Sequence, residues 1–268
     1  MNGDLSPELV NVYLGTRWLG RTLHFFPVVA STNEVLYELA LAGAPAGSMV
    51  LADFQTAGKG RLGRRWEAPA GSSLLFSLLF RPGWPAAQAA WLTMMAGLAT
   101  AEAVAGLTGV VVGLKWPNDV MIHTADGWRK VGGLLLAGDV TGERVELALM
   151  GIGLNVNMLA AELPAEVATP ATSLRLASGQ PVARAALLGR LLGRLERLYE
   201  AAERGESPRP GWEARLITRH QPVRVTQGGQ TLEGVAVGTD EWGQLLVRDG
   251  LGVLHTIPAG DVTLRGDG

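Results

Sequence analysis

The chain has 268 residues, of which 47% are hydrophobic and only 18% are charged, and its formal net charge is −2. This composition predicts a globular protein with a sizeable core and excludes disorder, collagen and coiled coil. A net charge so close to zero gives no general attraction to DNA or to anionic membranes, so any binding of nucleic acid must be local. No cysteine is present, which excludes disulfides, a thiolate zinc site and a cysteine nucleophile, and the four histidines lack metal-ligand spacing.

The amino terminus and the hydropathy of the chain predict a cytoplasmic protein. Residues 1–7 do not show a basic segment followed by an apolar one, so we expect no export signal. The most apolar stretch, residues 86–101, is shorter than the ~20 apolar residues that span a bilayer. We therefore expect no association with a membrane.

Apolar runs and helical patterns alternate over the first 200 residues. Strands are predicted over residues 23–30, 48–54, 73–80, 110–116, 131–140 and 145–157. A helix is predicted directly after Ser31 and another over residues 86–106, which is apolar almost all round and should be buried between layers. Residues 184–204 predict an amphipathic helix with a leucine stripe on one side and arginines opposite.

From residue 219 onward the sequence pattern changes and predicts short strands separated by glycine-containing turns. About fifty residues of consecutive hairpins predict a small closed barrel. We therefore expect two domains, residues 1–218 and residues 219–268. The expected fold class is α+β, with a mixed sheet packed with helices followed by a small β domain.

Lysine usage is the most informative internal statistic. Of the 23 lysines and arginines, only Lys59, Lys115 and Lys130 are lysines. An ammonium is a compact charge for a phosphate or carboxylate, and a guanidinium replaces it poorly where space is tight. Lys115 and Lys130 stand in unusual settings, KWPND and RKVGG, whereas a surface role is nearly as favoured for Lys59.

The segment GKGRLGRRW, residues 58–66, holds four cations and three glycines. Glycines let backbone amides approach an anion closely and the cations neutralise it, so the segment predicts a phosphate-binding loop. It is not a Walker loop, because GxxxxGK[ST] is absent. A mobile basic turn is the less favoured alternative, since like charges at this density repel one another without a ligand.

Two shorter motifs each have a functional and a structural interpretation. In KWPND, residues 115–119, a carboxylate beside an ammonium can orient that amine or hold a cation on a nucleotide, and a turn with a salt bridge is equally compatible. Ser31–Asn33 at a helix start is by default an N-cap worth about 1 kcal/mol, although its hydroxyls could also bind a polar ligand. Trp128 and Trp212 could stack on a ring, but tryptophan is more often core.

Four segments in this order resemble the biotin protein ligases: STN at 31–33, QTAGKGRLGRRW at 55–66, KWPND at 115–119 and KVGG at 130–133. The resemblance extends to GIGLNVN at 151–157, to ATSL at 171–174 and to the carboxyl-terminal β domain, which is SH3-like in that family. It covers nearly the whole chain. It implies a catalytic domain of the biotin/lipoate ligase type.

The resemblance also implies a two-step reaction. Biotin and MgATP give biotinyl-5′-AMP and pyrophosphate, and a lysine of a biotin carboxyl carrier protein, from acetyl-CoA carboxylase or a related carboxylase, attacks the mixed anhydride. The implied ligands are biotin, ATP and Mg²⁺, without a protein-bound metal. No covalent enzyme intermediate is needed, which fits the absence of cysteine.

The residues that match the family motifs imply a site. Lys130, Arg61, Lys115 and Asp119 are expected to be catalytic, with Lys130 between the carboxylate and the α-phosphate. The residues expected to bind biotin, ATP or the adenylate are Ser31, Thr32, Asn33, Gln55, Gly58, Lys59, Gly60, Arg61, Arg64, Trp66, Lys115, Asn118, Lys130, Gly132, Gly133 and Asn155. Lys59 stands where the family usually carries arginine, so the bidentate contact of a guanidinium is not expected there.

Only about twenty residues precede the expected catalytic domain, too few for the winged helix-turn-helix of repressor-type members. We therefore expect no DNA binding, while a homodimer remains open. The alternatives are a lipoate or octanoate ligase and, in a different class, a nucleic-acid-binding module. The basic loop, KWPND and the β domain favour biotin, and the acidic charge balance with few aromatics beside the loop disfavours nucleic acid.

Overall fold

The computed structural model describes residues 4–141, 143–164, 170–227 and 229–264. In chain order the elements are α1 (Pro7–Tyr13), β1 (Leu23–Val29), α2 (Thr32–Leu41), β2 (Met49–Gln55), η1 (Arg61–Gly63), β3 (Ser73–Phe80), η2 (Ala86–Ala89), α3 (Ala90–Thr108), β4 (Val112–Lys115), β5 (Asp119–Thr124), β6 (Gly127–Thr141), β7 (Arg144–Asn155), η3 (Ala160–Glu162), α4 (Leu174–Ser178), α5 (Arg184–Glu203), α6 (Arg209–Glu213), β8 (Pro222–Gln227), β9 (Gln230–Thr239), β10 (Leu245–Asp249), β11 (Leu254–Ile257) and β12 (Asp261–Leu264).

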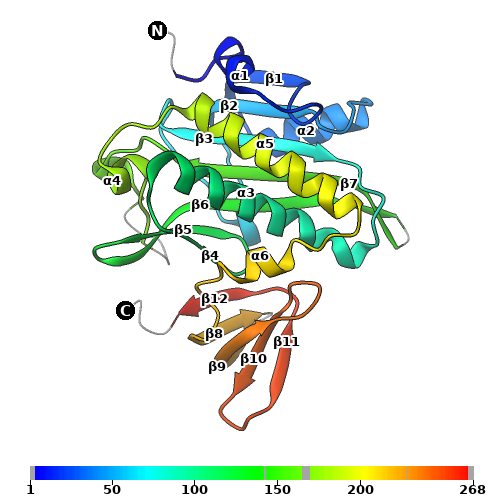
Figure 1. The fold of residues 1–268 in the computed structure, drawn as a ribbon, viewed down its shortest axis with the longest axis vertical. Coiled ribbons are helices and arrows are strands. Elements are labelled where there is room, and N and C mark those ends of the chain that lie inside the picture. Colours follow the sequence, from blue (N-terminus) through cyan, green and yellow to red (C-terminus); the bar gives the residue numbers. More distant parts are fainter. Residues whose placement is uncertain (1–3, 142, 165–169, 228, 265–268) are drawn as a thin grey trace.

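The larger sheet contains seven strands in the order β1-β2-β3-β7-β6-β5-β4. β1 and β2 are parallel and are joined by α2, and the other five neighbouring pairs are antiparallel. α3 and α5 cross one face of the sheet (Figure 1), and α2 packs on the other through Leu36 and Ala40. The expected mixed sheet packed with helices is confirmed.

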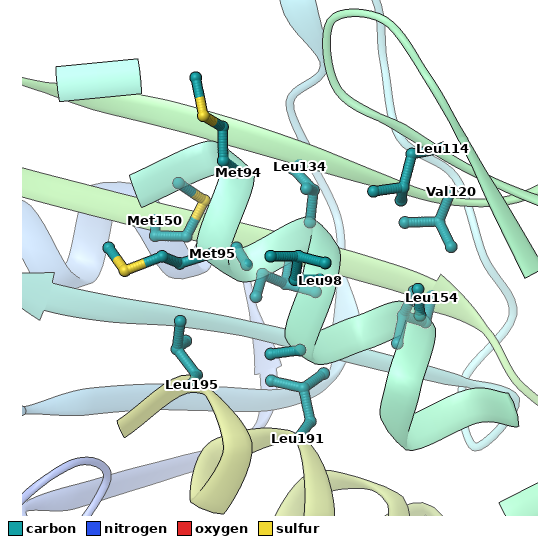
Figure 2. Close-up of a cluster of buried hydrophobic side chains, with 14 of the residues drawn as sticks. Met94, Met95, Leu98, Leu114, Val120, Leu134, Met150, Leu154, Leu191 and Leu195 are labelled. Atoms are coloured by element: carbon teal, nitrogen blue, oxygen red, sulfur yellow. The ribbon is translucent and has the colours of Figure 1, made fainter. Parts of the chain in front are cut away.

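The main core lies between this sheet and the helices α3 and α5. Side chains from the sheet and from both helices interdigitate there, as Figure 2 shows for Met94, Met95, Leu98, Leu134, Met150, Leu154, Leu191 and Leu195. Strand β3 is buried along its whole length, which explains its unbroken apolar run. The sheet is therefore rigid where it presents side chains to the site described below.

Helix α3 is apolar on every side because it is covered on every side. With the preceding turn, residues Ala86–Thr108 are long and apolar enough to cross a membrane by length and composition, which residues 86–101 alone did not suggest. However, 67% of the most apolar window is buried inside the structure, as in the core helix of a globular protein. The helix ends at Gly109, whose φ of 73° is the left-handed conformation that favours glycine.

Two charged residues of α5 attach the amino-terminal segment to the sheet. Arg184, expected on the solvent side, is only 2% exposed because it pairs with Asp4 and Asp53, each at 2.7 Å. The carboxylate of Glu196 accepts three consecutive backbone N–H groups, from residues 17–19, at 2.9–3.0 Å. Burial acts to raise the pKa of Glu196, but these backbone donors and the charge of Arg17 outweigh it and lower that pKa.

The carboxyl-terminal strands form a second, antiparallel sheet in the order β11-β10-β9-β8-β12, below the first in Figure 1. In the described residues β11 and β12 are its edges, so strand pairing does not make the closed barrel expected from the hairpins. Two hydrogen bonds connect this sheet to the first part of the chain. The indole Nε1 of Trp116, directly after β4, donates to Gly243 O at 2.9 Å, and Glu213 of α6 accepts from Thr239 N at 2.7 Å. The expected boundary at residues 218/219 falls between α6 and β8 and stays a prediction.

Candidate active site

A cavity of about 610 Å³ lies at one edge of the larger sheet, beside the second sheet. It is lined by the start of α2, the end of β2, the basic loop, the turn between β4 and β5, and parts of β6, β7 and β12. Of the residues predicted from the sequence, it brings together Ser31, Thr32, Asn33, Gln55, Lys59, Gly60, Arg61, Arg64, Trp66, Lys115, Asn118, Asp119, Lys130, Gly133 and Asn155. Segments more than a hundred residues apart thus meet in one space.

The end of the cavity at α2 is polar but uncharged. Ser31 is the N-cap residue of α2 and is 2% exposed, yet its side chain forms no capping hydrogen bond. The expected capping role is therefore not observed, and the hydroxyl remains at the cavity wall. Thr32 donates to Gln55 Oε1 from both its backbone N, at 2.7 Å, and its Oγ1, at 3.0 Å.

Glycines of β6 and β7 make room for the side chains on this wall. A Cβ on Gly151 would lie 2.7 Å from Asn33 Oδ1, and a Cβ on Gly153 would lie 2.8 Å from the Trp66 ring. Both distances are too short for real side chains, so only glycine allows Asn33 and Trp66 to pack on these strands. The indole Nε1 of Trp66 is buried and has no hydrogen-bond partner in the part of the chain that the structure describes.

Opposite charges meet at the other end of the cavity. Lys130 Nζ lies 2.6 Å from Asp119 Oδ1 and 5.9 Å from the centroid of the Trp66 ring. Asp119 of KWPND thus forms a salt bridge with Lys130, a residue outside that motif. Lys115 is 5% exposed and is the register partner of Asp119 across β4 and β5. An ammonium held among low-dielectric walls attracts an anion more strongly than one in water.

The basic loop closes on itself as a small hairpin. Gly60 N donates to Arg64 O at 2.7 Å and Trp66 N donates to Gly58 O at 2.9 Å. Near its tip, Leu62 has a φ of 54°, a conformation that is unfavourable for a residue with a side chain. Backbone hydrogen bonds thus define the conformation of the loop, which disfavours the alternative of a mobile turn.

The side chains of this loop connect it to both sheets. Arg61 Nη1 donates to Asn118 Oδ1 and to Gly260 O, both at 3.3 Å, and Arg64 forms an ion pair with Asp261. Burial lowers the pKa of the Arg61 guanidinium. The negative charge of Asp119 raises this pKa by a smaller amount, and the like charge of Arg64 lowers it further. Arginine nevertheless stays charged at neutral pH. Lys59, which also lines the cavity, pairs with Glu34 of α2, which does not.

Some residues are placed differently from what the sequence suggested. Gly58 and Gly132 lie next to the cavity but do not line it, and Gly132 instead allows the close approach of Leu154 across the sheet. Trp128 and Trp212 also lie outside the cavity. In the described ranges, no group of three or more His, Cys, Asp or Glu side chains could hold a metal.

Two parts of the site were not predicted. Asp261, Val262 and Thr263 of β12 line the cavity, although they are more than a hundred residues from the last predicted site residue, Asn155. Ser77 of β3 is fully buried and its Oγ lies 2.7 Å from Thr32 Oγ1. The only sequence signal for Ser77 is a hydroxyl in the middle of an otherwise apolar strand.

Comparison with known proteins agrees with this geometry. The profile of the biotin/lipoate A/B protein ligase family matches residues 25–155, and that of the biotin protein ligase C terminal domain matches residues 221–265. The chain is 35% identical over 266 residues to the biotin–[acetyl-CoA-carboxylase] ligase of Mycobacterium tuberculosis, covering 97% of this chain and 93% of that protein. It is 33% identical over 253 residues to the bifunctional ligase/repressor BirA of Bacillus spizizenii, covering 94% and 77% respectively.

A solved structure is similar over almost its whole length. The biotin protein ligase from Aquifex aeolicus, in complex with biotin and ATP, has a TM-score of 0.75 and 29% sequence identity, covering 91% of this chain and 99% of that one. The fold, the cavity and these matches define a ligase of the biotin/lipoate type. The carboxyl-terminal match and the sequence relatives go further, and the chain belongs to the biotin protein ligase family. The expected enzyme class and the SH3-like second domain are confirmed.

Proposed function

We propose that the chain activates biotin with MgATP to biotinyl-5′-AMP and transfers the biotin to a lysine of a biotin carboxyl carrier protein. The observation that supports this most directly is the polarity of the cavity, which is neutral and polar at α2 and cationic at Lys130 and the basic loop. Biotin carries a neutral urea at one end and a carboxylate at the other. Such a ligand fits with its urea at α2 and its carboxylate toward Lys130.

In the first step a carboxylate oxygen of biotin attacks the α-phosphorus of ATP. The bond from this phosphorus to the oxygen that bridges it to the β-phosphate breaks, and pyrophosphate leaves with the electron pair. Two anions must approach each other, so positioning and charge neutralisation supply most of the catalysis. Lys130 is suited to bridge the carboxylate and the α-phosphate, and Arg61 and Arg64 to neutralise the other phosphates.

The remaining catalytic residues act around this centre. Lys115, which is buried beside the KWPND turn, is assigned to the nucleotide side of the cavity. Asp119 holds the Lys130 ammonium at 2.6 Å and is the carboxylate best placed to meet the Mg²⁺ that arrives with ATP. One carboxylate together with substrate phosphates is a common way for proteins to bind that ion.

In the second step the neutral amine of the carrier lysine attacks the acyl carbon of the adenylate. A C–N bond forms, the C–O bond to the phosphate breaks, AMP leaves and the amine loses a proton. The mixed anhydride hydrolyses readily, so it must be kept from water until the carrier arrives. The basic loop, held by Arg61 and Arg64 against the rest of the protein, is suited to that role.

The partners follow from this reaction. The M. tuberculosis relative is named for acetyl-CoA carboxylase, and a carrier domain of such a carboxylase is the proposed substrate here. The absence of DNA binding stays a prediction, supported by the net charge of −2 and tested by a mobility-shift assay on duplex DNA with biotin and MgATP present. Homodimer formation and cytoplasmic location also stay predictions.

The runner-up is ligation of lipoate or octanoate, which the first family profile alone does not exclude because it covers both types. The carboxyl-terminal profile is that of biotin protein ligases and favours biotin. A lipoyl or octanoyl chain would also offer no hydrogen bond to the NH2 group of Gln55, whose oxygen already accepts from Thr32.

Pyrophosphate release from MgATP tests the proposal, measured with biotin, with lipoate or octanoate, and without an acid. Release that requires biotin supports the assignment, and labelled biotin should then appear on a carrier domain. Release with lipoate or octanoate but not with biotin would overturn the substrate. Release without any acid would indicate that the basic loop serves another reaction.

A further inference from the structure

Ser77 is a fully buried polar residue on strand β3 that belongs to none of the recognised motifs. Its Oγ lies 2.7 Å from Thr32 Oγ1 and 2.5 Å from the amide oxygen of Asn33. On β7 its register partner is Gly151, which leaves the space that the Asn33 amide occupies. Ser77 does not line the cavity itself, so it can affect a ligand only through the two residues above it.

A count of protons defines the direction of the hydrogen bonds in this cluster. The backbone N–H of Thr32 can only donate, so the Gln55 atom 2.7 Å away must be an acceptor oxygen. The hydroxyl of Thr32 lies 3.0 Å from the same oxygen and therefore donates to it as well. Its lone pairs are then available to receive the hydroxyl proton of Ser77.

The proton of Ser77 cannot serve both of its neighbours. Three close contacts, from Asn33 to Ser77, Ser77 to Thr32 and Thr32 to Gln55, contain only two hydroxyl protons. The arrangement in which all three contacts are hydrogen bonds takes its third proton from the Asn33 amide. The oxygen and nitrogen of an amide are interchanged by turning it about its last bond, and the hydrogen-bond network decides between the two orientations. In that arrangement Nδ2 of Asn33 faces Ser77.

This orientation determines what the cavity offers to a ligand. Asn33 lines the cavity, and with Nδ2 donating to Ser77 its Oδ1 is the amide atom left to accept. The oxygen of Gln55 is occupied by Thr32, so the remaining group of that amide is a donor. A ligand with an N–H next to a carbonyl, as in a cyclic urea, satisfies both groups, whereas a dithiolane or an alkyl chain satisfies neither.

We propose that Ser77 is a positioning residue that fixes the Asn33 amide with its oxygen toward the cavity and so sets the preference for a cyclic urea. The proposal rests on the proposed function, because it places the biotin urea at the α2 end of the cavity. Without the Ser77 hydroxyl the Asn33 amide is free to turn, and a bound urea must hold it in place. The effect should therefore fall on binding of biotin and not on the chemical step.

The test compares wild type with Ser77→Ala in biotin-dependent pyrophosphate release. We expect the KM for biotin to rise about three- to tenfold, as for the loss of one hydrogen bond, with kcat within about twofold and the KM for ATP unchanged. Ser48→Ala is the matched control, because Ser48 is equally buried but donates to Pro45 O at 2.7 Å outside the cluster. Its KM for biotin should equal that of wild type.

Two further measurements separate this role from other ones. Desthiobiotin keeps the urea but lacks the ring sulfur, so its KM should rise by the same factor, and an unchanged KM would mean that Ser77 serves the sulfur instead. In an Asn33→Ala background the effect of Ser77→Ala should shrink to less than about twofold, whereas an additive effect would show that Ser77 does not act through Asn33.

Folding is checked by thermal unfolding, and Ser77→Cys, of similar volume and with a weaker donor, replaces the alanine variant if the latter does not fold. The cysteine variant should show a smaller rise in the KM for biotin. An unchanged KM for biotin in a folded, active variant would overturn the proposal. Failure of wild type to release pyrophosphate with biotin would instead overturn the proposed function, so the two failures are distinguishable.

Discussion

Replacement of Lys130 by methionine is the most direct test of the catalytic assignment. Methionine keeps the length of the side chain but removes the charge that lies 2.6 Å from Asp119. In the variant Asp119 loses its ion-pair partner and adds to the negative charge where the carboxylate and the α-phosphate must approach. Adenylate formation should therefore fail, although the fold should survive because Lys130 is a cavity residue and 28% of its side chain is exposed.

The expected size of the effect follows from the charge separation. Two unit charges about 4 Å apart interact by about 4 kcal/mol at an effective dielectric constant near 20. Since about 1.4 kcal/mol corresponds to tenfold in rate, loss of this interaction in the transition state costs about 10³-fold. Water at a partly exposed side chain screens part of it, so we expect a loss of about 10²–10³-fold in the rate of adenylate formation.

The assay is single-turnover formation of biotinyl-5′-AMP, with biotin affinity measured separately by calorimetry. Affinity should fall far less than the rate, because the charge is needed most where the two anions meet. Lys130→Arg keeps the charge but spreads it over a larger planar group, so its rate should lie between those of wild type and Lys130→Met. A Lys130→Met enzyme with more than about a tenth of the wild-type rate would refute the assignment.

Three other substitutions test the surroundings of the site. Arg61→Gly removes the contacts that hold the basic loop, so free adenylate should appear in solution faster than biotin is transferred, as measured by chromatography of the products. Glu196→Gln should lower the Tm by roughly 3–10 °C at pH 7. Because the folded-state pKa of Glu196 is lowered, its contribution is present above the ordinary value of about 4.3 and is lost as the pH falls, so the difference should narrow below about pH 4. Trp116→Phe leaves Gly243 O without its donor and should lower the Tm more than Trp91→Phe, whose indole N–H has no partner among the described residues.

Patterns within one segment were sufficient to predict most of the sheet. The run over residues 73–80 is β3, and the apolar stretch at 86–106 is the short turn η2 followed by the buried helix α3. Strand β5 was missed because it has six residues and begins two residues after the proline of KWPND, where the sequence indicates a turn. Arg184 was expected in solvent because its partner Asp4 is 180 residues away, which no local pattern reveals.

The same distinction applies to the site. Glycines, cations and hydroxyls close together in sequence indicated the residues of the cavity, since motifs of this kind owe their spacing to one ligand. The contribution of β12 was not predictable, because the four residues Asp261–Leu264 contain nothing that identifies the sheet they join or the cavity they face. Ser77 was missed for a different reason, since a single serine in a buried strand shows its partners only when α2 is folded above it.

The charge of the cavity differs in sign from that of the whole chain. Six cationic side chains and three carboxylates line it, in a protein whose net charge is −2. Lys130 pairs with Asp119 and Arg64 pairs with Asp261. An anion that binds must therefore displace a carboxylate from each cation, so its binding free energy is less favourable than at an unpaired cation. The excess of cations over carboxylates, which is three on the cavity wall and two once Glu34 beside Lys59 is counted, is what attracts an anionic ligand. The first anion to bind opens these ion pairs, so the second meets cations already released from their carboxylates, and biotin should bind more tightly when an ATP analogue is bound. Calorimetry of biotin with and without a non-hydrolysable ATP analogue measures this coupling, and equal affinities would show that the ion pairs do not respond to the ligands.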